Sequence, residues 1–137
     1  MDLGQILGSP ESTTIPQLVQ LLGDPDETKS YGSVKYYCFY SKGIAIGVDK
    51  GRVDSADFYK GGRYTCAPKE LLPEWLAPEM TGKQFVETFG EPVEKGGGGK
   101  GGIDIWLRWK DFQVDIKETD WDKAKDQPWT SVTIFEP

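Results

Sequence analysis

Two stretches of this chain repeat one another: Thr14-Ile-Pro-Gln-Leu-Val-Gln-Leu-Leu-Gly-Asp-Pro-Asp-Glu27 and Thr81-Gly-Lys-Gln-Phe-Val-Glu-Thr-Phe-Gly-Glu-Pro-Val-Glu94. They are offset by 67 residues, and Thr, Gln, Val, Gly, Pro and Glu coincide at six positions without a gap. Agreement at one fixed offset is the signature of an internal duplication. We therefore predict two repeats, residues 1–67 and 68–137, that form one compact unit because each alone is marginal in size.

Each stretch predicts a short helix with defined ends. Thr14 and Thr81 are candidate N-caps, and the glutamine three residues later completes a capping box. Apolar residues at helical spacing indicate one buried face. We expect Gly23 and Gly90 to end the helices in the left-handed conformation, since a proline two residues later prevents continuation.

Alternating apolar residues and short turns follow each helix, a pattern typical of antiparallel hairpins. We predict three strands per repeat, at residues 34–40, 44–48 and 53–59, and at residues 103–109, 112–116 and 129–135. The predicted fold is therefore α+β, with two tandem helix-helix-antiparallel-sheet repeats. They form one continuous curved sheet with helices on one face.

The second copy, Met80-Thr-Gly-Lys-Gln84-Phe-Val86-Glu-Thr-Phe-Gly90-Glu-Pro92, is followed by an aromatic strand, a second strand and a closing strand. This pattern resembles a superfamily of small helix-helix-sheet repeats. It contains outer-membrane-assembly lipoproteins of the SmpA/OmlA (BamE) type and tandem-repeat β-lactamase inhibitor proteins. Two copies in one chain favour the inhibitor-like arrangement, and the resemblance implies a concave sheet face rich in aromatics. The inhibitors carry a disulfide in each repeat, whereas the second repeat here has no cysteine.

Strand alternation divides the side chains between two faces of the sheet. Apolar side chains, with Cys38 among them, are expected beneath the helices. We expect the other face to expose aromatic and charged side chains, which are typical of a recognition surface. The predicted partner-binding residues are Tyr37, Phe39, Tyr59, Trp106, Arg108, Trp129 and Phe135. Coverage of this face by loops, or aromatic pairs that only stabilise the sheet, are the alternatives.

Composition excludes several kinds of chemistry. The 137 residues include no histidine, which excludes Ser-His-Asp and Cys-His catalysis and histidine-ligated zinc. A net charge of −6 argues against nucleic-acid binding. The glycine-rich stretch 95–102 lacks the Ser or Thr of a phosphate loop and is expected to be flexible, and the acidic stretch 118–126 lacks the calcium-loop pattern. We expect no catalytic residue, no metal and no cofactor.

The sequence thus favours a non-enzymatic protein-binding module, an inhibitor of a partner protein, that acts as a monomer. The alternative is a small-molecule or lipid-binding protein with a pocket between helices and sheet, and an enzyme that uses carboxylates only is a third hypothesis.

No window is long and apolar enough to cross a membrane. A cytoplasmic location is expected, with a secreted mature form as the alternative. Cys38 and Cys66 are expected to be free thiols, with one disulfide between them as the alternative.

Overall fold

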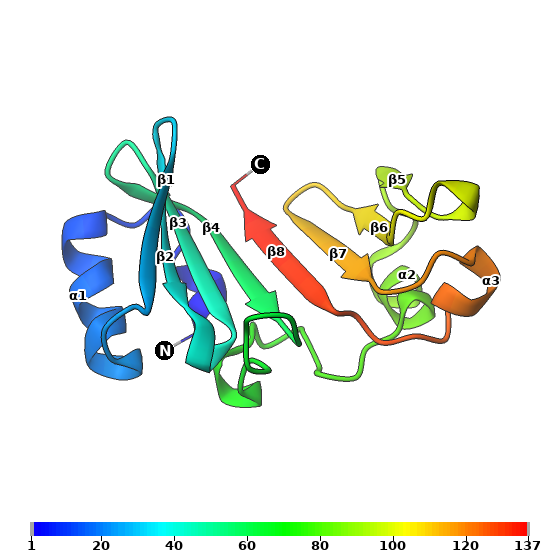
Figure 1. Cartoon of the computed structure of the whole chain (residues 1–137), viewed down its shortest axis with the longest axis horizontal. Coiled ribbons are helices and arrows are strands. Elements are labelled where there is room, and N and C mark those ends of the chain that lie inside the picture. The colour runs from blue at the N-terminus through cyan, green and yellow to red at the C-terminus, as the bar shows by residue number, and fades with distance from the viewer. Residues whose placement is uncertain (1, 137) are drawn as a thin grey trace.

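The chain alternates helices with antiparallel hairpins over residues 2–136, the part that this computed structural model describes (Figure 1). In chain order the elements are η1 (Leu3–Gln5), α1 (Glu11–Leu22), β1 (Glu27–Tyr31), β2 (Val34–Phe39), η2 (Tyr40–Lys42), β3 (Ile44–Asp49), β4 (Arg52–Tyr59), η3 (Lys69–Leu71), α2 (Gly82–Phe89), β5 (Glu94–Gly96), η4 (Gly99–Gly101), β6 (Ile105–Arg108), β7 (Phe112–Ile116), α3 (Trp121–Ala124) and β8 (Ser131–Phe135). The four η elements are short 3₁₀ turns.

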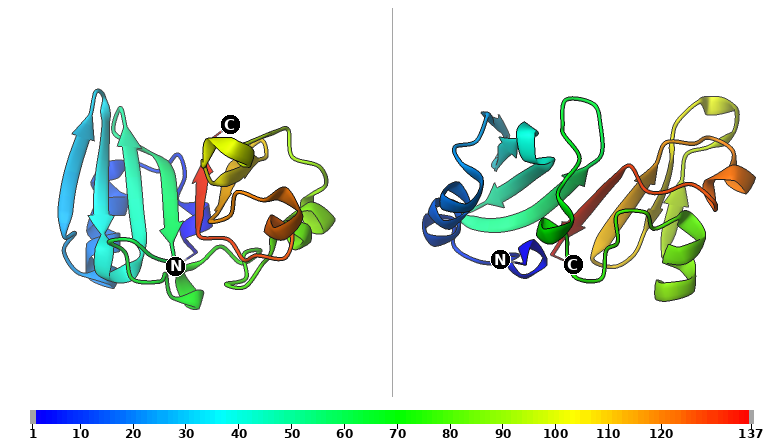
Figure 2. Two further views of the ribbon diagram at one scale, coloured as in Figure 1. Left: turned by 45° about the vertical axis from the view of Figure 1, so that its right-hand side comes forward. Right: turned by 90° about the horizontal axis from the view of Figure 1, so that it is seen from below.

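Eight strands form one antiparallel sheet in the order β1-β2-β3-β4-β8-β7-β6-β5. Strands β1–β4 come from the first predicted repeat and β5–β8 from the second. The last strands of the two repeats, β4 and β8, pair with each other and join the halves. Both α1 and α2 lie on one side of the curved sheet (Figure 2, right). The predicted α+β class with one continuous sheet and helices on one face is confirmed.

Each repeat contributes four strands, so the prediction of three was wrong. The additional strands are β1 and β5, which lie at the two edges of the sheet. Their sequences, Glu-Thr-Lys-Ser-Tyr and Glu-Lys-Gly, are polar and lack the apolar alternation that reveals a half-buried strand. Such edge strands are common because charged side chains discourage pairing with another chain.

The two helices begin differently although their sequences correspond. Helix α2 has the predicted capping box, in which Thr81 accepts from the Gln84 amide and the Gln84 side chain accepts from the Thr81 amide. Helix α1 begins one turn earlier, after Pro10. Thr14 is therefore inside the helix, buried, with its hydroxyl 2.6 Å from that of Ser9. The prediction of Thr14 as an N-cap was wrong because residues 11–13 extend the helix.

Gly23 and Gly90 end the helices with positive φ, as predicted, at φ 86° and 80°. Their ψ angles are −178° and −172°, outside the left-handed helical region, so the predicted left-handed conformation of these two glycines was wrong. This combination of angles is accessible essentially only to glycine. The chain leaves both helices in the same direction, toward an edge strand.

The core fills the space between the helices and the sheet. In the second repeat it is largely aromatic: Trp109 stacks on Phe112 with ring centroids 4.9 Å apart, and Phe85 and Phe89 of α2 pack on both. In the first repeat α1 contributes aliphatic residues such as Leu18, which is fully buried. The helices thereby cover one face of the sheet and leave the other uncovered.

Candidate functional site

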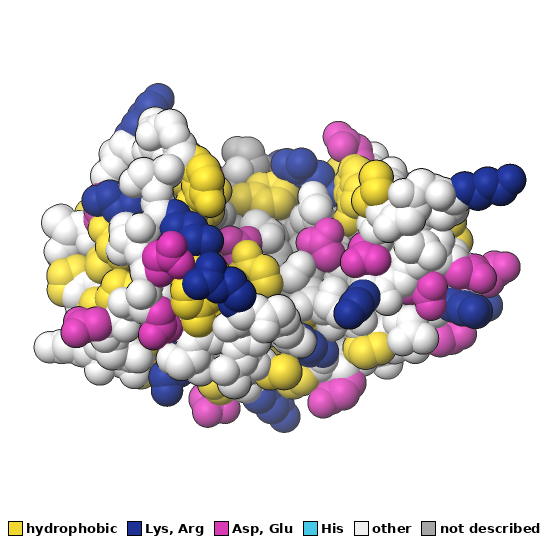
Figure 3. All heavy atoms as spheres, viewed as in Figure 1, with side chains coloured by type: hydrophobic (Ala, Val, Ile, Leu, Met, Phe, Trp, Pro, Cys, Tyr) yellow, Lys and Arg dark blue, Asp and Glu magenta, His cyan; other side chains and the backbone are white. Residues whose placement is uncertain are grey.

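Within residues 2–136, no helix covers the sheet face opposite α1 and α2, and we call this surface the open face. In Figure 2 (right) the loop of residues 60–67 rises above it, and Figure 3 shows hydrophobic, acidic and basic side chains interspersed over it. Strand pairing places these residues on the open face: Lys29, Tyr31, Tyr36, Cys38, Ala45, Gly47, Ser55, Asp57, Tyr59, Ser131, Thr133, Phe135, Gln113, Asp115, Trp106 and Arg108.

Four predicted site residues lie on the open face. Trp106 is half-buried, and its indole ring lies over Gly96 of the adjacent strand. The ring is so close that a Cβ added at Gly96 would come within 2.5 Å of it. The exposed guanidinium of Arg108 lies 4.7 Å from the centre of the Phe135 ring, a cation–π contact. Tyr59 is also there, with its ring stacked on Tyr64 at a centroid distance of 4.0 Å.

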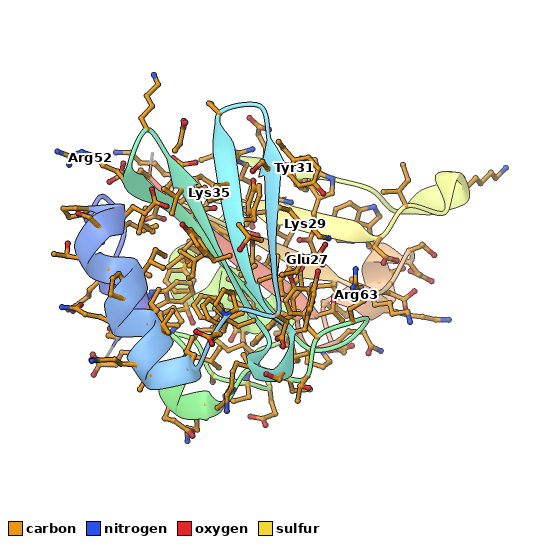
Figure 4. All side chains as sticks on the ribbon, turned by 60° about the vertical axis from the view of Figure 1, so that its left-hand side comes forward. Glu27, Lys29, Tyr31, Lys35, Arg52 and Arg63 are labelled. Atoms are coloured by element: carbon orange, nitrogen blue, oxygen red, sulfur yellow. The ribbon has the colours of Figure 1, made fainter. Side chains whose placement is uncertain are left out.

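Two predicted site residues, Tyr37 and Phe39, lie on the helix side instead. Phe39 is 1% exposed within the core, and the Tyr37 hydroxyl donates to the carboxylate of Glu11 on α1. Figure 4 shows Lys35, on the same side of β2, facing α1, while Glu27, Lys29, Tyr31 and Arg63 lie on the other side.

The error at β2 is a shift of one residue. Phe39 pairs with Ile44, and Trp109 holds the corresponding position opposite Phe112, so Phe39 matches Trp109. The turn that follows is two residues longer in the first repeat, Tyr40–Gly43 against Lys110–Asp111 after Trp109. Matching Tyr40 with Trp109 reverses every side chain of the strand. Cys38, expected in the core, therefore lies on the open face.

The third misplaced residue is Trp129, which is 1% exposed rather than on the surface. Strand β8 begins two residues later, so its alternation does not reach Trp129. The indole nitrogen donates to the Ala77 carbonyl at 2.9 Å, and the Lys60 ammonium lies 4.1 Å from the ring centre. Trp129 fastens the segment between the repeats to the sheet and contributes no exposed surface.

The structure also brings together open-face residues that the sequence analysis did not select. A cavity of about 350 Å³, here called the tyrosine pocket, is lined by Lys29, Tyr31, Tyr36, Cys38, Ala45, Asp57, Tyr59 and Tyr64. Ala45 of β3 faces it between Cys38 of β2 and Asp57 of β4, and this small side chain leaves the hollow. Tyr64 comes from the loop above the sheet, and no sequence pattern marks it.

Asp57 is the buried acid of the tyrosine pocket. Asp57 is 9% exposed, and one oxygen of its carboxylate accepts a hydrogen bond from the Thr133 hydroxyl at 2.5 Å. Burial raises the pKa of Asp57 to about 6, with the nearby charge of Asp115 adding to the rise and the Thr133 hydroxyl opposing it. Burial and the Asp57 charge likewise raise the pKa of Tyr59. Asp57 thus supplies a carboxylate to the pocket, which Lys29 also lines.

A second cavity, of about 370 Å³, lies on the helix side of the second repeat, and we call it the helix-side cavity. Ile105, Leu107 and Ile116 of the sheet, Val86 of α2 and Trp121 form its apolar wall. Lys83, Lys95, Lys125, Glu87 and Glu91 lie at its rim.

The first repeat has no corresponding cavity among the pockets described, because larger side chains occupy that space. Gly82 and Leu107 of the second repeat correspond to Ile15 and Tyr37 of the first, and both of these pack against the core.

The glycine-rich stretch 95–102 is more ordered than expected. Gly98 donates to the Ile103 carbonyl and Gly99 to the Thr119 carbonyl. A Cβ at Gly97 would come within 2.1 Å of the Asp104 carbonyl, and Trp121 lies against Gly98, so these glycines permit close packing.

Other candidate chemistry is limited. Within residues 2–136 no group of three or more Cys, Asp or Glu residues is arranged to hold a metal ion, and no helix has the length and apolar character to cross a membrane. Cys38, buried, and Cys66, exposed, are both free thiols, as expected.

This architecture, with two helix-backed hairpin repeats joined into one antiparallel sheet, also occurs in known structures. It is similar to an extracellular protein containing a SCP domain from Bacillus anthracis, with a TM-score of 0.61 and 8% identity over 99% of this chain. It is also similar to a cysteine-rich secretory protein from Staphylococcus aureus, with a TM-score of 0.55 and 11% identity over 98% of this chain. The match covers 46% of each neighbour, so this chain spans about half their length.

At these identities the likeness extends to the fold alone. No protein-family model matches the chain, and no curated protein sequence does either.

Proposed function

We propose that this protein is a non-enzymatic binding module that recognises another protein through its open face and inhibits that partner by covering its surface. The observation that carries the proposal is an uncovered sheet face that presents Trp106, Arg108 and Phe135 beside a tyrosine-lined cavity. Trp, Tyr and Arg are the residue types that dominate the binding energy of protein interfaces.

The two structural neighbours support a secreted setting. One is described as extracellular and the other as secretory. They lend no support to the cytoplasmic location expected from the sequence. Small secreted proteins are often stabilised by disulfides, but both cysteines here are free. A secreted form of this chain would therefore depend on its hydrophobic core for stability.

Capture of a partner from the source organism tests the proposal. Immobilised wild-type protein is compared with a Trp106→Ala/Phe135→Ala variant and with a helix-side control, Leu21→Ser, whose side chain is 47% exposed. A partner retained by the wild type and the control, and lost by the open-face variant, is the expected result. Equal retention by all three proteins refutes binding through the open face.

The helix-side cavity favours a second function, the binding of a small apolar ligand. Its volume lies within the range of small-molecule sites. At the rim Lys83 is paired with Glu87, whereas Lys95 and Lys125 suit a ligand with an anionic group. The probe 1-anilinonaphthalene-8-sulfonate has both properties, and Leu107→Phe fills the cavity. Probe fluorescence that rises with wild type and not with Leu107→Phe supports this function, and equal fluorescence with both rejects it.

A further inference from the structure

The tyrosine pocket carries an inference about what the partner contributes to the interface, and this inference rests on the proposed function. We propose that the pocket receives the cationic side chain of an arginine or lysine of the partner protein, held between tyrosine rings and the Asp57 carboxylate. Three observations carry this proposal: an unneutralised buried acid, an aromatic wall and an anchored loop above the sheet.

The first observation is that Asp57 has no cationic partner among residues 2–136. The contacts around its carboxylate are the Thr133 hydroxyl and the like charge of Asp115. Lys29 also lines the pocket, but its ammonium lies 6.0 Å from the centre of the Tyr40 ring, and Tyr40 and Glu27 raise its pKa. A buried carboxylate without a counter-charge is costly to the folded protein, and an incoming cation removes that cost.

The second observation is the aromatic wall. Tyr59 and Tyr64 are stacked on one side, and Tyr31 and Tyr36 form an edge-to-face pair 5.8 Å apart on the other. The negative faces of such rings attract an ammonium or guanidinium group within about 6 Å. The protein already uses this contact next to the pocket, where the Arg63 guanidinium lies 4.5 Å from the centre of the Tyr40 ring.

The third observation is that the loop with Tyr64 is held in place. Thr65 donates to the Tyr40 carbonyl at 2.8 Å and Ala67 donates to the Tyr59 carbonyl at 3.1 Å. Arg63 forms an ion pair with Glu27 of β1 at 3.6 Å, across the open face from Tyr59. Such anchoring keeps the aromatic wall in position before the partner arrives, which lowers the entropy cost of binding.

The occupant is assigned to a protein side chain because of where the pocket lies. It opens on the same face as Trp106, Arg108 and Phe135, so a protein that covers this face also covers the pocket. A free small cation would contact only the pocket. A partner's arginine or lysine gains from both surfaces, as an anchor residue within a larger interface does.

Side-chain analogues test the proposal directly. N-acetyl-arginine amide and N-acetyl-lysine amide are titrated up to about 50 mM, a range that detects millimolar binding, into ¹⁵N-labelled wild-type protein. We expect saturable shifts of the Ala45, Asp57 and Tyr64 amide signals. N-acetyl-glutamine amide and N-acetyl-glutamate amide, which have no positive charge, should produce none.

Variants assign the effect to the pocket. Asp57→Asn keeps an acceptor for Thr133 and removes the charge, and Tyr64→Leu removes a ring. Asp104→Asn removes an equal charge at an exposed position of the second repeat. Asp57→Asn should weaken binding roughly tenfold or more, Tyr64→Leu should weaken it less, and Asp104→Asn should not change it. The dispersion of each NMR spectrum reports folding.

Three results overturn the proposal: no saturable shift for either cationic analogue, equal affinity in Asp57→Asn, or tighter binding of tetramethylammonium than of both analogues. Failure here is distinguishable from failure of the proposed function. If the analogues bind and the Trp106→Ala/Phe135→Ala variant still captures its partner, the cation site stands and the open-face interface is rejected.

Discussion

Asp57 and Thr133 lie opposite each other in the β4–β8 pair, and they hold equivalent positions in the two repeats. Ser55 corresponds to Ser131 and Tyr59 to Phe135, while Ser55 pairs with Phe135 and Tyr59 with Ser131. An approximate two-fold axis therefore passes through the sheet at Asp57 and Thr133. At this axis an acid meets a hydroxyl donor, and the difference breaks the symmetry at the centre of the open face.

The buried Asp57 predicts a stability that falls as pH rises. Between about pH 4 and pH 6 the unfolded carboxyl has lost its proton while the folded one retains it, so the folded state binds more protons. The free energy of unfolding should therefore decrease across this window by about 2–3 kcal/mol, the amount that a shift of this size represents. Urea denaturation at a series of pH values measures the change.

Asp57→Asn should remove this part of the pH dependence. The variant should match the wild type near pH 4 and exceed it in stability at pH 7, because the wild type then carries an unneutralised buried charge. Stability curves of the two proteins that run parallel from pH 4 to pH 7 would show that Asp57 does not titrate in this window.

The two tryptophans expected on the same surface should differ in their effect on stability. Trp129→Ala removes a fully buried side chain and should cost about 3–5 kcal/mol. Trp106→Ala removes a half-buried side chain from the open face and should cost far less, about 1 kcal/mol. Chemical denaturation of both variants measures the difference, and similar losses would contradict the buried position of Trp129.

Gly43→Ala should displace the loop of residues 60–67, whose Tyr64 lines the tyrosine pocket together with Cys38. Gly43 has φ 68°, and a Cβ there would lie 2.2 Å from the Thr65 carbonyl oxygen, so the loop must move. In the wild type an aromatic disulfide reagent should react quickly with Cys66 and slowly with Cys38. In Gly43→Ala both thiols should react quickly.

Gly61→Ala is the matched control for the loop, because a Cβ at Gly61 meets no atom within 4 Å and its φ is not positive. Its thiol kinetics should equal those of the wild type. Slow reaction of Cys38 in Gly43→Ala would mean that the loop does not protect this thiol.

The cap of α2 predicts a measurable effect of Thr81. Thr81→Ala removes the acceptor for the Gln84 amide and should lower the free energy of unfolding by about 0.5–2 kcal/mol. Thr81→Ser retains a hydroxyl and should stay within about 0.5 kcal/mol of the wild type. Equal losses in both variants would assign the effect to the Thr81 methyl group instead of the cap.

The repeated helix motif and the strand alternation together were sufficient to predict the fold class, and the cap and terminating glycine of α2 lie where expected. Alternation was sufficient for β6 and β7, where Trp106 and Arg108 were correctly assigned to the open face. It failed at β2 because the turn after β2 is two residues longer than the turn after β6, and this difference has no signature in the alternation itself. It failed at Trp129 because a large aromatic residue before a strand has the same pattern as one within it.

The tyrosine pocket could not be predicted at all from local pattern. It depends on Tyr64, which belongs to no repeat motif, and on Ala45 lying between Cys38 and Asp57. That neighbourhood is a property of strand register across three strands. A sequence pattern describes one strand at a time, so the burial of Asp57 becomes visible only once the sheet is assembled.

The β4–β8 junction has a consequence for how such a molecule can be built. A lone first repeat would expose β4 as an unpaired edge, and two copies could associate by joining these edges about a true two-fold axis. Asp57 would then face its own duplicate, and two carboxylates in that position repel each other. Covalent tandem linkage lets the two central positions diverge, so an acid can persist there with a hydroxyl as its neighbour. The duplicated chain therefore permits an asymmetric binding surface that a homodimer of half-molecules cannot form.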